Sequence, residues 1–225
     1  MMLNRPKLVL IDLDGTLVDS VPDLAEAGDR MMKDLGLAPR GEDASRNWVG
    51  NGVERFCKRT LLGALDGEPD DALFEKALPL FTKHYQETNG NFSRLFDGVK
   101  EGLDMLQAQG YKLGCVTNKA ADFTIPLLKS KGIHDYFGVI VSGDTLAVKK
   151  PDPAPLLHAA KELGVSPEES TMLGDSMHDA EAGRRAGFQV VCVSYGYNHG
   201  HDIRDAKPDA VIDSFMELEG LFPSN

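Results

Sequence analysis

Two aspartates separated by one residue, Asp12 and Asp14, follow an apolar run at residues 8–11 and are followed at once by Gly15. The run is typical of a strand buried on both faces of a parallel sheet. Because an unpaired carboxylate is costly to bury, we expect both acids at the carboxyl end of this strand, where open α/β sheets bind ligands. An isolated Asp-x-Asp-Gly is equally consistent with an ordinary turn.

Later apolar runs also end in polar side chains, namely Thr117 and Asn118, Lys150, and Asp175 with Asp179 one helical turn further on. The carboxyl ends of parallel strands lie at the same edge of a sheet, so we expect these groups to converge with the first acid pair. Carboxylates, a hydroxyl, an amide and an ammonium are suited to binding Mg²⁺ together with a phosphate. The set therefore indicates a magnesium and phosphate site rather than a turn.

Segments with strand and helix patterns alternate along the second half of the chain. We expect helices at 99–109, 122–131, 153–163 and 178–186, and strands at 112–116, 138–141, 171–173 and 189–193. Alternation of this kind predicts an α/β fold with a doubly wound parallel sheet.

The chain between the first two strands is too long for a simple crossover. A βαβ unit needs about 30 residues, whereas the second expected strand begins only at residue 112. Helix patterns at 21–35, 53–65 and 71–87 fill the interval, and Asp19 and Ser20 fit an N-cap for the first helix. We predict a core domain of residues 1–15 and 92–225, an inserted helical domain of residues 16–91, and hinges near 16–20 and 91–97.

The composition is that of a soluble globular protein, with 42% hydrophobic and 26% charged residues in 225. There is no apolar run of membrane-spanning length and no signal-peptide pattern, so we expect a cytoplasmic protein without a membrane partner. The net charge of -11 argues against a nucleic-acid partner. Cys57, Cys115 and Cys192 are expected as buried free thiols. Either a monomer or a homodimer is consistent with the sequence.

Four segments resemble the motifs of the haloacid-dehalogenase-like phosphatases. They are D-L-D-G-T-L-V-D-S at 12–20, V-T-N at 116–118, K-P-D-P at 150–153 and G-D-S-M-H-D at 174–179. They occur in order over nearly the whole chain. The resemblance implies a Rossmann-like core with an α-helical cap inserted after the first motif, which the strand spacing indicates independently. W-V-G-N-G-V at 48–53 and Y-G-Y-N-H-G at 195–200 further resemble bacterial phosphoglycolate phosphatases.

The resemblance implies a phosphomonoester hydrolase that forms an aspartyl-phosphate. Asp12 would attack phosphorus, and it needs no activating base because an ordinary aspartate is ionised at neutral pH. Asp14 would protonate the leaving oxygen and then deprotonate water. Mg²⁺ would be bound by the side chains of Asp12 and Asp175 and by the main-chain carbonyl of Asp14. Lys150 would balance the charge of the nucleophile and the phosphate.

The same resemblance implies that Thr117, Asn118 and backbone N–H groups near Gly15 bind the phosphate oxygens. Asp179 would orient Lys150 or a metal-bound water, with direct ligation of the metal as the alternative. Some simpler interpretations stay open: Thr117 as a cap of the following helix, Lys149 in place of Lys150, and His178 as an ordinary helix-start residue.

Substrate selection is expected in the cap, where the candidate cations for a substrate carboxylate are Arg46, Arg55, Lys58 and Arg59. Each of them could instead belong to a solvated helix face. A small anionic substrate, most simply 2-phosphoglycolate, fits this expectation. The alternatives are a phosphatase for a sugar or nucleoside monophosphate, a phosphomutase, and a phospho-accepting signalling domain. A halide-releasing dehalogenase would need neither the acid at position 14 nor a metal.

Overall fold

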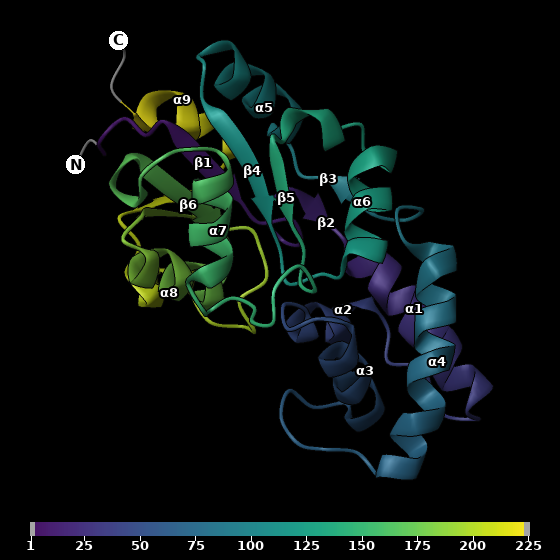
Figure 1. Ribbon diagram of the computed structural model, residues 1–225. Coiled ribbons are helices and arrows are strands. Elements are labelled where there is room, and N and C mark those ends of the chain that lie inside the picture. Colours follow the sequence, from purple (N-terminus) through teal and green to yellow (C-terminus); the bar gives the residue numbers. More distant parts are fainter. Residues whose placement is uncertain (1–2, 223–225) are drawn as a thin grey trace.

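The fold is seen in a computed structural model that describes residues 3–222, and its centre is a parallel sheet of six strands within that range (Figure 1). The strand order is β5-β4-β1-β6-β7-β8, and each neighbouring pair is parallel. The strands are β1 (Leu8–Ile11), β4 (Lys112–Val116), β5 (Val139–Val141), β6 (Ser170–Gly174), β7 (Gln189–Val193) and β8 (Ala210–Ile212). The predicted doubly wound α/β fold is confirmed.

Strand β1 lies in the middle of the sheet, between β4 and β6, and all four of its residues are fully buried. Successive side chains of a strand point to opposite faces. Val9 and Ile11 accordingly pack in one hydrophobic cluster, and Leu8 and Leu10 in another. Burial on both faces explains why the sequence of β1 is continuously apolar instead of alternating.

Helices cover both faces of the sheet. The cluster around Val9 and Ile11 includes residues of α5, α6 and α9, and the cluster around Leu8 and Leu10 includes residues of α7 and α8. These helices are α5 (Val99–Ala108), α6 (Ala121–Ser130), α7 (Ala154–Glu162), α8 (Met177–Ala186) and α9 (Leu218–Leu221). Short 3₁₀ turns are η1 (Arg46–Trp48), η2 (His134–Tyr136), η3 (Pro167–Glu169), η4 (Ile203–Ala206) and η5 (Phe215–Glu217).

A separate group of helices lies beside the carboxyl edge of the sheet (Figure 1). It consists of α1 (Val21–Asp34), α2 (Glu42–Ser45), α3 (Val53–Leu62) and α4 (Asp71–Thr88), here called the helical unit. Its own hydrophobic cluster contains Met31, Phe56, Phe81 and Tyr85. The predicted insertion is thus helical, whereas the boundaries of two domains stay a prediction.

The two segments expected as hinges pair with each other. Strands β2 (Val18–Asp19) and β3 (Arg94–Leu95) form a short antiparallel ribbon where the chain enters and leaves the helical unit. Asp23 reinforces this connection, because its buried carboxylate accepts hydrogen bonds from three backbone N–H groups of the returning segment, those of Gly90, Phe92 and Ser93.

The expected N-cap position of the first helix is confirmed, and one of the two candidates occupies it. Ser20 occupies the N-cap position of α1, but its side chain makes no capping hydrogen bond to the described residues. The Asp19 carboxylate instead accepts a hydrogen bond from the Tyr197 hydroxyl and pairs with Arg46 at 3.3 Å. These two partners come from distant parts of the chain, so local spacing could not reveal them.

The three cysteines are free and buried, as expected. None of the helices within residues 3–222 combines the length and the apolar character needed to span a membrane.

Candidate active site

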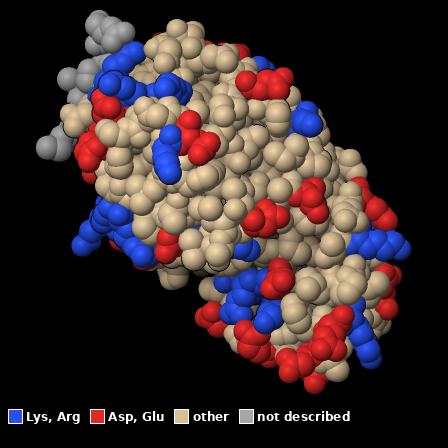
Figure 2. All heavy atoms as spheres, viewed as in Figure 1, with Lys and Arg blue, Asp and Glu red and all other residues tan. Residues whose placement is uncertain are grey.

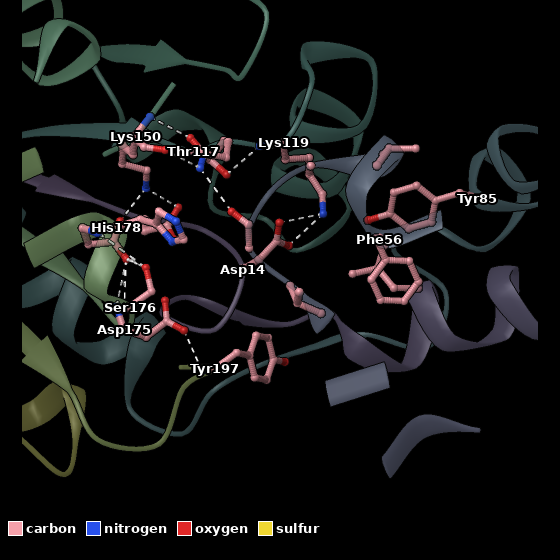
Figure 3. Close-up of a pocket in the computed structure, with 18 residues that line it drawn as sticks. Asp14, Phe56, Tyr85, Thr117, Lys119, Lys150, Asp175, Ser176, His178 and Tyr197 are labelled. Carbon is pink, nitrogen blue, oxygen red and sulfur yellow. Dashed lines mark hydrogen bonds and ion pairs between the residues drawn. The ribbon is translucent and has the colours of Figure 1, made fainter. Parts of the chain in front are cut away.

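The ends of β1, β4 and β6 meet at a cavity of about 40 Å³ between the sheet and the helical unit. Asp12, Asp14, Thr117, Asn118, Lys150, Asp175 and Asp179 all line it, so the structure brings most of the predicted site residues together. Figure 3 shows Lys150 and Asp175 on one side of the cavity, Phe56 and Tyr85 on the other, and Asp14 between them. Convergence follows from the parallel topology, which places these strand ends at one edge.

Asp12, Asp175 and Asp179 form a buried acid cluster in which one oxygen of each carboxylate lies within 4.8 Å of the others. The ammonium of Lys150 lies 2.8 Å from Asp12 Oδ1 and 2.7 Å from Asp179 Oδ1, and it also donates to Val116 O at 2.6 Å. Three carboxylates and one ammonium leave a net charge of -2 when all are ionised. The cluster therefore carries an excess of negative charge.

The pKa shifts of the residues in this cluster reflect their burial and the excess of negative charge. Burial is the largest cause that raises the pKa of Asp12, to about 7, although Lys150 opposes it. Burial, followed by the charges of Asp179 and Asp12, raises the pKa of Asp175 well above its usual value. Burial works in the opposite direction for Lys150, but the neighbouring carboxylates of Asp12 and Asp179 outweigh it and raise its pKa. Both acids would ionise more readily beside an additional cation.

The donor set fits a hard divalent cation. The cluster offers carboxylate oxygens, which Mg²⁺ prefers. Asp12 Oδ1 is buried and, apart from its ion pair with Lys150, receives no hydrogen bond of normal geometry from the described residues. Such an oxygen is available for a metal ion. By contrast, Asp179 accepts hydrogen bonds at both oxygens, from Lys150 and from Ser176, which suits the predicted positioning role.

Asp175 is fixed by the loop after β7. Its Oδ2 accepts a hydrogen bond from the Tyr197 backbone N–H at 2.6 Å, and its Oδ1 accepts one from the Thr16 hydroxyl at 3.0 Å. Gly15 and Gly196 allow this close approach, because a Cβ atom on either would lie 2.2 Å from an Asp175 side-chain atom. Gly15 also has a φ of +88°, which favours glycine.

The predicted phosphate-binding groups differ in how far their polar atoms are already hydrogen-bonded within the protein. The Gly15 N–H already donates to Val18 O at 2.9 Å. The Asn118 amide is committed as well, since it donates to Gly50 O and Lys150 O and accepts from the Lys150 N–H. Asn118 therefore fixes the backbone of Lys150 and joins it to the helical unit. Thr117 lines the cavity, and its hydroxyl accepts a hydrogen bond from the Lys119 N–H at 3.2 Å rather than capping α6, whose N-cap is Ala120.

Lys119 is a site residue that the sequence analysis missed. It is 5% exposed, and its ammonium contacts both oxygens of Asp14, at 2.7 and 2.8 Å. The ammonium also lies 5.2 Å from the centre of the Tyr85 ring, which comes from α4. The signal in the sequence was its position directly after Thr117 and Asn118, where the chain leaves β4.

The loop at residues 49–53 and the start of α8 close the cavity from two sides. Val49, Gly50, Gly52 and Val53 line it from the helical unit. His178, expected only as a helix-start residue, lines it too, and its Nε2 lies 3.2 Å from the Asn51 side-chain nitrogen. This contact joins the sheet to the loop above the acid cluster.

None of the four candidate cations of the cap is among the described residues that line this cavity. Arg46 pairs with Asp19 and with Glu42, and it lies over the Tyr197 ring. Arg59 is buried inside the helical unit, where its guanidinium donates to Trp48 O and Leu65 O.

Arg55 and Lys58 both pair with Glu68 on the loop after α3. Figure 2 shows basic side chains gathered over α3 next to acidic ones, which agrees with pairing on the surface rather than inside the active site. Lys149, the alternative to Lys150, is exposed and lines a neighbouring surface pocket.

Comparison with known proteins identifies the family. Residues 9–193 match the family described as haloacid dehalogenase-like hydrolase. The match covers most of the chain and includes all four motifs, so the protein belongs to this hydrolase family.

Within the family, the chain is similar to bacterial phosphoglycolate phosphatases. The phosphoglycolate phosphatase of Nitrosococcus oceani is 57% identical over 220 residues, which are 98% of each chain. That of Thiobacillus denitrificans is 50% identical over 211 residues, covering 94% of this chain and 93% of the relative. A crystal structure described as a predicted phosphoglycolate phosphatase from Haemophilus somnus superposes with a TM-score of 0.90 at 36% identity, covering 97% and 98% of the two chains. The predicted resemblance is confirmed.

Proposed function

We propose that the protein is a Mg²⁺-dependent phosphomonoester hydrolase that forms an aspartyl-phosphate on Asp12 and acts on 2-phosphoglycolate. The proposal rests on one observation: the buried acid cluster has an excess of negative charge, and Asp14 lines the same cavity beside it. A nucleophilic carboxylate, a second acid and a cation-binding cluster are the groups that phosphoryl transfer to an aspartate requires.

In the first step Asp12 attacks phosphorus, the bond between phosphorus and the ester oxygen breaks, and Asp14 donates a proton to that oxygen. In the second step water attacks phosphorus, Asp14 takes the proton of the water, and phosphate leaves while the Asp12 carboxylate is restored. Lys150, 2.8 Å from Asp12 Oδ1, holds the nucleophile in place and offsets its charge. Mg²⁺ held by Asp12, Asp175 and the main-chain carbonyl of Asp14 would stabilise the charge on the transferring phosphoryl group.

A small substrate is supported by the relatives. The named relatives are phosphoglycolate phosphatases. We place the reaction in the cytoplasm, because three free buried thiols suit a reducing compartment.

The test is phosphate release from a panel of small phosphomonoesters, with Mg²⁺ and after its removal by EDTA. We expect the fastest turnover with 2-phosphoglycolate, loss of activity in EDTA and recovery with added Mg²⁺. Weak and equal activity on all esters would exclude the proposed substrate. Isomerisation of a sugar phosphate without phosphate release would identify a phosphomutase instead.

The aspartyl-phosphate is tested separately with D12N, which keeps the size of the side chain. This variant should bind substrate but release no phosphate. Turnover near the parent rate would exclude Asp12 as the nucleophile.

A further inference from the structure

We propose that Lys119 and Tyr85 form the subsite that binds the carboxylate of the substrate. This inference rests on the proposed function, since it concerns the non-reacting end of a small phosphorylated carboxylic acid. From the sequence, this role was expected for arginines and lysines of the cap alone. The subsite instead combines one residue that follows a strand of the sheet with one residue of the helical unit.

Charge is the first reason. Of the described residues that line the cavity, Lys119 and Lys150 carry a permanent positive charge. An ammonium has three N–H donors. Lys150 is committed to the acid cluster, because it pairs with Asp12 and donates to Asp179 and to the Val116 carbonyl. Lys119 is directed away from the acid cluster, since it contacts the two oxygens of Asp14 and lies beside the Tyr85 hydroxyl.

Tyr85 provides the second observation. Its side chain is fully buried and lines the cavity, and its hydroxyl lies beside the Lys119 ammonium but makes no hydrogen bond of normal geometry to the residues described. Leaving a buried hydroxyl without a partner costs free energy, so such a group in a cavity indicates a ligand. The ring is held between Phe123 and Phe81, with centroid distances of 4.6 and 5.7 Å. The hydroxyl is therefore held in place before any ligand binds.

The chemistry of the substrate fits this position. In 2-phosphoglycolate the carboxylate oxygens are three bonds from the ester oxygen. That ester oxygen is the atom that Asp14 protonates, so a cation for the carboxylate must lie next to Asp14. The Lys119 ammonium lies 2.7 Å from Asp14 Oδ1 and 5.2 Å from the centre of the Tyr85 ring, whose hydroxyl points toward it (Figure 3). The remaining wall on this side is apolar, formed by Leu24, Val49 and Phe56, which strengthens an ion pair.

Residues from two elements complete this subsite. Lys119 follows β4, whereas Tyr85 lies on α4 of the helical unit. A carboxylate bound by both would connect the helical unit to the sheet at the point where the proton is transferred. Recognition of the carboxylate would thereby favour the closed arrangement that excludes water from the reaction.

The test compares 2-phosphoglycolate with ethyl phosphate, an ester of similar size without the carboxylate. The measured quantity is the ratio of the two kcat/KM values, because any effect of a variant on Asp14 or on the nucleophile is common to both substrates and cancels. We expect K119M to lower this ratio about 10- to 100-fold and Y85F about 3- to 10-fold. Y85F keeps the ring and its packing, so it decides the question if K119M does not fold.

The matched control is K83M, which removes the same charge from the exposed face of α4 and should leave the ratio unchanged. If the parent prefers 2-phosphoglycolate but the Lys119 and Tyr85 variants lose the same factor on both esters, the subsite is excluded and the proposed function stands. If the parent itself shows no preference, the proposed substrate is excluded, and the carboxylate subsite with it.

Discussion

Replacing Asp175 by asparagine is expected to make the metal-free protein more stable. Asp175 is buried beside Asp12 and Asp179, and a single lysine offsets the three charges. Asparagine has nearly the same shape and can keep both hydrogen bonds, because its carbonyl accepts from the Tyr197 N–H and its amide donates to the Thr16 oxygen. The substitution removes a charge without leaving a cavity or an unpaired buried group.

The magnitude follows from the distances. Two charges within 4.8 Å of each other repel by at least about 3.5 kcal/mol at an effective dielectric constant of about 20. Burial and the neighbouring charges raise the pKa of Asp175, so it can bind a proton instead of bearing the full repulsion. Keeping a carboxyl with an ordinary pKa of about 3.9 protonated at pH 7 costs about 4.2 kcal/mol, which is the upper limit. D175N should therefore raise the free energy of unfolding by about 1–4 kcal/mol, or the Tm by roughly 2–16 °C.

Thermal unfolding of the EDTA-treated proteins, followed by circular dichroism, measures this difference. Because the pKa of Asp175 is raised in the folded state, the native protein holds a proton that the unfolded chain loses above about pH 4. The stability of the parent protein then falls as the pH rises toward 7, and the advantage of D175N grows. Mg²⁺ should reduce the advantage of D175N, since it stabilises the parent by about 2.7 kcal/mol at 100 times its Kd. A metal-free D175N that is less stable than the parent would refute the reasoning.

Three further substitutions test other contacts. D14N should lower kcat for phosphate release about 10²- to 10⁴-fold, and a loss below tenfold would contradict its role as acid and base. G15A places a Cβ 2.2 Å from Asp175 Oδ2 and should weaken Mg²⁺ activation, measured by titrating activity with the metal; an unchanged midpoint would contradict this. D23A leaves three backbone N–H groups without their acceptor and should lower the free energy of unfolding by roughly 3 kcal/mol or more, read from denaturant curves. A change below 1 kcal/mol would show that water replaces the carboxylate.

The sheet and the convergence of the strand ends could be predicted because both follow from local patterns and one topological rule. A continuous apolar run predicts a central strand such as β1, and parallel strands end at one edge. Strand β5, with three residues, was predicted because it lies between two helix patterns, whereas the equally short β8 (Ala210–Ile212) was missed because no α-helix separates it from β7. Strands β2 and β3 were missed because each has two residues and depends on its partner.

The side chains around the substrate could not be predicted, because their partners are far away in the sequence. Arg55 and Arg59 are one helical turn apart, and both were candidate cations for a substrate carboxylate. In the structure Arg55 faces Glu68 on the surface, while Arg59 points inward to the Trp48 carbonyl. Lys119 was overlooked because its importance depends on Asp14, 105 residues earlier. Spacing along a helix shows which residues share a face, but not what that face contacts.

The electrostatics of the acid cluster favour a bound cation over a purely structural role. A buried ion pair adds little stability even when its charges balance, because desolvation offsets the attraction. Here the charges do not balance: Asp12, Asp175 and Asp179 face one ammonium, that of Lys150. A cluster that served stability alone would be improved by replacing one acid with a neutral residue. Three buried acids in this arrangement lower the stability of the protein. A bound divalent ion would restore neutrality in the working protein, which explains why the three acids are present despite that loss of stability.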